Sequence, residues 1–339
     1  MAKTWKDYIL RSGAPLEYEV ARAMSKSGFE VSADLSYLRR ELDGSKEHSV
    51  DIFASFWGEP ATFAAHLLVE CKYRSPEKSL LLLQDPNVDI AVSNLGGTVV
   101  CVDHFVPFYL GTNAFLEMEA DCPLVYKGVE IHEKDNAVDV EFRRAIQQLR
   151  FGMPAALHRA VESSIFNTEA SVDDTHAIFL APVLVTNAPL LVLKEEVDIK
   201  TIENAEDLSE IAERTGMAVL FSQHGPEYVQ HFHGAMQQLV IGDFADSFIR
   251  LLEKSIRKKR KKIRCHESPA QILRDMRGDD QAWCYETGDQ FYIVNLDYLP
   301  TFLSLFLSGC RMAYKFRGKR AGKEVVDPDK LFSMDGKDV

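Results

Sequence analysis

The chain has 339 residues, of which 46% are apolar, so it can form a sizeable core and is not a disordered or fibrous protein. Its net charge of -12 excludes a uniformly basic nucleic-acid binder, and any phosphate contact must come from a local basic surface. No segment resembles a signal peptide or a membrane span, and the six cysteines form no close pairs. We therefore expect a reduced, cytoplasmic protein without structural zinc.

The first seventy residues predict a helix followed by three strands. After a break near Gly13–Pro15, apolar residues recur at helical spacing between Leu16 and Ser27, and Gly28 fits the end of that helix. Polar residues 39–49 are predicted to form a turn, and a second turn at 58–60 would pair the strands around it antiparallel. The predicted strands are 29–38, 49–57 and 64–73.

The rest of the chain predicts further strands and helices, and hence a mixed α/β protein. The Gly152–Pro154 break favours two domains, residues 1–155 and an α/β unit at residues 156–339. We expect strands at 177–185 and 189–193, paired as a hairpin, and at 217–222 and 290–296. We expect helices at 138–149, 205–215, 228–239 and 245–264, and after the last strand.

Two carboxylates and one ammonium are expected to meet at one end of the predicted hairpin. In the run LLVECKY, Glu70 and Lys72 share one face of a strand, and antiparallel pairing would place Asp51 beside Glu70. Carboxylates are hard ligands for Mg²⁺, which polarises a phosphoryl oxygen and activates bound water. A lysine beside the ion can position that water or neutralise developing charge. The alternative is an ordinary cross-strand ion pair on an exposed sheet edge.

The runs LEYEVARAMSKSGFEV, SVDIFA and LLVECKYR together resemble the catalytic core of the PD-(D/E)xK restriction-endonuclease superfamily, in particular its Mrr-like restriction enzymes. The resemblance covers about residues 14–110. It implies a restriction-endonuclease-like core, with a central mixed sheet flanked by helices, and it makes Asp51, Glu70 and Lys72 the signature residues. Val50 stands where the motif is named for a proline, and that proline is often missing in such enzymes.

The resemblance also implies an acidic residue on the first helix. The family pattern of an apolar residue and Glu, then Val-Ala, then a closing glycine selects Glu17, whereas the helical positions alone leave Glu19 open. The implied catalytic residues are Glu17, Asp51, Glu70 and Lys72, with the three carboxylates as metal ligands. The implied activity is Mg²⁺-dependent cleavage of DNA, with Mn²⁺ as a substitute ion, in restriction or anti-phage defence.

A dense basic segment later in the chain predicts phosphate contacts. Between Arg250 and Arg264 there are nine basic residues and the single acidic residue Glu253. Lysine and arginine supply sequence-independent affinity for phosphates, although a solvated surface helix would have the same composition. We assign nucleic-acid binding to Arg257, Lys258, Lys259, Arg260, Lys261, Lys262 and Arg264.

Three functions remain open from the sequence. The first is a metal-dependent endonuclease acting on DNA, although the core chemistry does not distinguish DNA from RNA. The second is a non-catalytic nucleic-acid-binding protein on a nuclease-like scaffold, and the third is a protein-interaction module. Cleavage of a duplex by one site per chain would favour a homodimer, and no membrane partner is expected.

Overall fold

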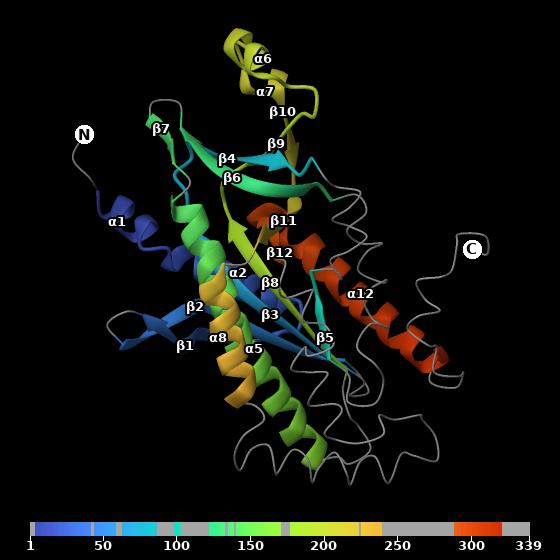
Figure 1. The fold of residues 1–339 in the computed structure, drawn as a ribbon. Coiled ribbons are helices and arrows are strands. Elements are labelled where there is room, and N and C mark those ends of the chain that lie inside the picture. The colour runs from blue at the N-terminus through green and yellow to red at the C-terminus, as the bar shows by residue number, and fades with distance from the viewer. Residues whose placement is uncertain are drawn as a thin grey trace.

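The computed structural model describes residues 4–41, 44–58, 63–86, 98–102, 122–132, 135–138, 140–170, 177–223, 225–238 and 288–320. The protein is α/β, with one large mixed sheet flanked by helices (Figure 1). The strands are β1 (Glu30–Glu41), β2 (Gly44–Trp57), β3 (Phe63–Lys72), β4 (Lys78–Gln84), β5 (Val100–Val102), β6 (Leu124–His132), β7 (Asp135–Val138), β8 (Ala177–Thr186), β9 (Leu190–Leu193), β10 (Ala212–Thr215), β11 (Met217–Gln223) and β12 (Gly288–Asn295). The helices are α1 (Trp5–Arg11), α2 (Ala14–Lys26), α5 (Val140–Ala170), α6 (Ile199–Asn204), α7 (Leu208–Ile211), α8 (Pro226–Gln238) and α12 (Leu299–Arg320), with a 3-10 turn, η2 (Leu296–Tyr298), before the last.

The sheet joins strands that are far apart in the sequence. Its order is β1-β2-β3-β8-β12-β11-β6-β4-β9-β10, with β5 beside β8 and β7 beside β6. Strand β3 pairs antiparallel with β2 and parallel with β8, which also pairs parallel with β12. Strands from both sides of residue 155 therefore belong to one sheet, and the division into domains at that point stays a prediction.

Most of the helices and strands predicted for the N-terminal part agree with the structure. The helical region breaks at Gly13, whose φ of 82° lies in the left-handed region that favours glycine, and α2 follows. The predicted antiparallel pairing of β2 with β3 is confirmed. The predicted turn at 39–49 is wrong, because β1 runs to Glu41 and pairs residue by residue with the start of β2. The sequence of these strand ends is polar, so alternation of apolar residues could not reveal them.

Helix α5 is longer than predicted. It continues through Gly152 and Pro154, where we expected it to end, and reaches Ala170. Its buried residues Leu149, Phe151 and Leu157 lie on both sides of the proline and pack into one core. Burial of this continuous apolar face outweighs the loss of one helical hydrogen bond at the proline.

Two predictions for the second half are also wrong. Strands β8 and β9 do not form a hairpin, because β8 lies between β3 and β12 whereas β9 pairs with β4 and β10. All ten residues of β8 are buried, as expected for a strand inside a parallel arrangement. The predicted helix at 205–215 is one short helix, α7, followed by strand β10. The predicted basic helix at 245–264 lies outside the described residues.

A separate core covers each face of the sheet. On one face, Val20 and Met24 of α2 pack with Phe302 and Phe306 of α12. On the other, residues of α5 and α8 pack over Leu68 and neighbouring strand residues. Figure 1 shows α5 and α8 side by side on this second face. None of the helices among the described residues is long and apolar enough to cross a membrane.

Candidate active site at the end of the β2–β3 hairpin

Asp51 lies where strands β2 and β3 separate. The regular pairing of the two strands ends at Ile52 and Val69. Beyond this pair, a side chain replaces the backbone as hydrogen-bond acceptor. The Asp51 Oδ2 accepts a hydrogen bond of 2.7 Å from the backbone N–H of Cys71. This contact fixes Asp51 beside Glu70, as the hairpin interpretation predicted. Burial raises the pKa of Asp51, although the Cys71 N–H and Lys72 oppose that shift.

Glu70 is the most deeply buried carboxylate of the group. Its side chain is 0% exposed, and its Oε1 accepts a hydrogen bond of 2.5 Å from Lys72 Nζ. Its other oxygen, Oε2, has no hydrogen-bond partner within the described part of the chain. Burial raises the pKa of Glu70 to about 7, because the loss of hydration outweighs the attraction of Lys72 and Asp51 adds repulsion. A buried, half-satisfied carboxylate of this kind is suited to bind a proton or a cation.

Glu17 brings a third carboxylate toward the site from the first turn of α2. Burial, followed by repulsion from Asp51 and Asp34, raises the pKa of Glu17, and Lys72 lowers it. These electrostatic couplings place Glu17 within reach of the charges of Asp51 and Lys72. The alternative residue, Glu19, is exposed.

Asp34 is a fourth carboxylate, which the sequence interpretation missed. It lies in β1 between Ala33 and Leu35, whose pairing partners in β2 are Ile52 and Val50, so it lies across from Asp51. Its φ of 55° is left-handed, a conformation that aspartate adopts more readily than most residues. Counting register outward from the predicted β1 and β2 would have pointed to it.

Gln148 of α5 connects Lys72 to the neighbouring strand. Its Oε1 accepts a hydrogen bond of 3.4 Å from Lys72 Nζ, and its Nε2 donates one of 3.4 Å to the carbonyl of Ser49. Four residues later in α5, a Cβ on Gly152 would meet Val50 Cγ2 at 2.7 Å, so glycine allows the helix to lie close to β2 here. No motif in the sequence indicated Gln148, because it reaches the site only through the packing of α5.

The carboxylate oxygens of this cluster are the type of ligand that a hard divalent cation requires. They are the ligands that Mg²⁺ prefers, and Glu70 Oε2 is free of protein partners among the described residues. Within those residues, no three His, Cys, Asp or Glu side chains are arranged as a ligand group. Asp51 and Glu70 are thus the pair that could hold an ion, with Glu17 and Asp34 adding to the negative surroundings.

The structure describes only some of the site residues that the sequence predicted. Glu17, Asp51, Glu70 and Lys72 are gathered at the end of the β2–β3 hairpin. The predicted nucleic-acid-binding residues between 257 and 264 lie outside the described residues. A search of protein-family models, of curated proteins and of solved structures finds no match to this chain.

Proposed function

We propose that this protein is a Mg²⁺-dependent endonuclease that hydrolyses phosphodiester bonds of DNA on a restriction-endonuclease-like core. The observation that carries the proposal is the grouping of Asp51, Glu70 and Lys72, with Glu70 Oε2 left without a partner in the part of the chain that the structure describes. A purely structural ion pair would need Glu70 and Lys72 only. The additional carboxylates of Glu17 and Asp51 make the apo site electrostatically unfavourable, which is expected where a cation is to be bound.

The roles of the residues follow from their positions. Asp51 and Glu70 would hold the ion, which when bound would polarise a phosphoryl oxygen and lower the pKa of a water molecule. The Cys71 N–H keeps the Asp51 carboxylate oriented. Lys72 remains 20% exposed, so its ammonium can donate to a phosphate oxygen and stabilise the negative charge that develops during hydrolysis.

The proposal is tested by incubating the protein with duplex DNA, single-stranded DNA and RNA in Mg²⁺, Mn²⁺ or chelator. We expect cleavage of DNA only with the metal ions, and a loss of at least about 100-fold in rate for Asp51→Asn and for Lys72→Met. Glu17→Gln should also slow cleavage, whereas Glu19→Gln is its matched control and should cut at the parent rate.

Two results would contradict the proposal. If Asp51→Asn and Lys72→Met cut as fast as the parent protein, the assigned residues are not the active site. If the protein binds DNA but no divalent ion supports cleavage of any substrate, the protein is a non-catalytic binder on this scaffold. Sedimentation of the protein with a short duplex tests the accompanying proposal that a homodimer cuts both strands.

A further inference from the structure

The chain that follows β3 is held in a fixed position by side chains from the end of β8. The Thr186 hydroxyl donates a hydrogen bond of 2.8 Å to the carbonyl of Lys72. The Asn187 amide pairs with the backbone of Arg74, accepting from its N–H and donating to its carbonyl, both at 2.7 Å. These contacts extend the β3–β8 pairing two residues past the last ladder pair, between Lys72 and Thr186. Arg74 is therefore anchored as firmly as a strand residue.

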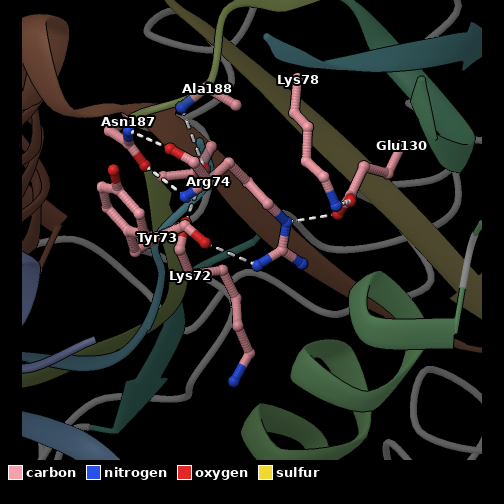
Figure 2. Close-up of polar contacts among 8 residues, drawn as sticks. Lys72, Tyr73, Arg74, Lys78, Glu130, Asn187 and Ala188 are labelled. Atoms are coloured by element: carbon pink, nitrogen blue, oxygen red, sulfur yellow. Dashed lines mark hydrogen bonds and ion pairs between the residues drawn. The ribbon is translucent and has the colours of Figure 1, made fainter. Parts of the chain in front are cut away.

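A cluster of two cations and one carboxylate lies beside this anchored segment. The Arg74 guanidinium and the Lys78 ammonium both donate to the carboxylate of Glu130 on β6. Figure 2 shows the two cationic groups converging on Glu130, while the ammonium of Lys72 points away from them. Burial alone would raise the pKa of Glu130, but the hydrogen bonds and charges of Lys78 and Arg74 have the larger combined effect. The pKa of Glu130 is therefore lowered overall, and the carboxylate stays charged. The cluster thus carries one positive charge in excess.

The two cations keep unused hydrogen-bond donors. Arg74 uses Nε for Glu130 and Nη1 for the carbonyl of Tyr73, whereas its Nη2 contacts no acceptor among the described residues. Lys78 contacts Glu130 through one of its three donors, and its side chain is 34% exposed. A recess beside the cluster is lined by Lys72, Arg74, Glu130 and Thr186. Lys72 of the proposed active site and Arg74 of the cluster thus line the same recess.

We propose that Arg74 and Lys78 form a phosphate-binding subsite, which holds the DNA phosphodiester next to the one that is cleaved. A phosphodiester carries one negative charge, which matches the excess charge of the cluster. Because Asn187 fixes the backbone of Arg74, the guanidinium loses less conformational entropy on binding a phosphodiester. Glu130 limits the total charge of the subsite, because its one carboxylate pairs with both cations and competes with the phosphate for their donors. This inference takes its ligand from the proposed function.

The test measures DNA affinity without cleavage, with a fluorescent 30-base-pair duplex in chelator, for Arg74→Gln, Lys78→Gln and Glu130→Gln. We expect each of the first two to weaken binding by about 5- to 30-fold and to reduce the slope of log Kd against log salt by about 1. Glu130→Gln should tighten binding several-fold, because it removes the competing carboxylate. The exposed Lys127 on β6 is the matched control, and Lys127→Gln should change Kd by less than twofold.

The opposite results overturn the subsite. Unchanged affinity and salt slope in Lys78→Gln, with its melting temperature preserved, would mean that the cations contact no phosphate. Weaker binding in Glu130→Gln, equal to that in Arg74→Gln, would mean that the ion pairs only support the fold. The nuclease assignment can fail separately from the subsite. If Arg74→Gln and Lys78→Gln weaken DNA binding but the protein cleaves no DNA, the subsite stands and the nuclease assignment fails. If the protein cleaves DNA and neither variant changes the cleavage rate, only the subsite is refuted.

Discussion

Among the titratable side chains that β3 buries, His66 and Glu70 lie four residues apart and have different surroundings. Both are 0% exposed and, by strand alternation, lie on the same face. His66 Nδ1 bonds Ser55 Oγ at 2.9 Å, and the ring stacks on Phe53. Burial, together with the charge of Arg159, lowers the pKa of His66 to about 3, so the ring is neutral.

Glu70, in contrast, lies beside Asp51 and Lys72. Each side chain leaves one polar atom without a partner among the described residues, His66 Nε2 and Glu70 Oε2. Burial and an unpaired atom are thus common to both positions. The charges around Glu70 distinguish a candidate site from a core histidine, and the following predictions test that distinction.

The largest effect is expected for Glu70→Gln. The pKa of Glu70 is about 7 in the folded protein and 4.5 without the fold, so the folded state binds the extra proton. The stability that this proton provides is present below pH 4.5 and is lost as the pH rises through 7. At about 1.4 kcal/mol per pKa unit, the parent protein should lose about 3 kcal/mol more than Glu70→Gln between pH 4.5 and pH 8.

Denaturant unfolding in chelator at the two pH values measures this difference. Glu141→Gln, an exposed position at the start of α5, is the matched control and should follow the parent protein. If the free energy of unfolding of Glu70→Gln and of the parent depended equally on pH, Glu70 would be ionised without penalty. The Glu70–Lys72 contact would then be an ordinary ion pair.

A smaller effect of opposite sign is expected for His66→Asn. Because the pKa of His66 falls from 6.5 to about 3 on folding, the folded state binds fewer protons. The stability linked to neutral His66 is present above pH 6.5 and is lost as the pH falls toward 3. The parent protein should therefore lose about 2 kcal/mol more than His66→Asn between pH 7 and pH 5, measured by denaturant unfolding. DNA cleavage by His66→Asn at pH 8 should match the parent rate, and a large loss would make this end of β3 functional as well.

The smallest effect is expected for Gln148→Ala. Gln148 contacts Lys72 at the long distance of 3.4 Å, so removing it should cost about 1 kcal/mol of transition-state stabilisation. Steady-state cleavage should show kcat lowered about 3- to 10-fold with KM unchanged. Gln147→Ala, at the exposed neighbouring position, is the control. If both variants behave alike, Gln148 only packs α5 against the sheet.

Much of the candidate site could be predicted from short-range rules. The break at Gly13 and the apolar spacing gave α2, and the turn after Trp57 gave the antiparallel pairing of β2 and β3. Asp34 lies inside the predicted strand 29–38, but the predicted turn at 39–49 left the register of this strand on its neighbour uncounted. Gln148 lies inside the predicted helix 138–149, but no motif marks it. In both cases the element was predicted, and only its pairing or packing with another element brings the residue to the site.

The sequence by itself determined that Glu70 and Lys72 share one face of a strand, because side chains alternate with a period of two. It also determined that Asp51 could pair beside them, because the connection between the strands is short. Only the tertiary structure decided that β8, more than a hundred residues later, lies against β3 and anchors Lys72 and Arg74 through Thr186 and Asn187. Pairing of distant strands depends on which buried faces fit together across the whole sheet, and no local pattern records that choice.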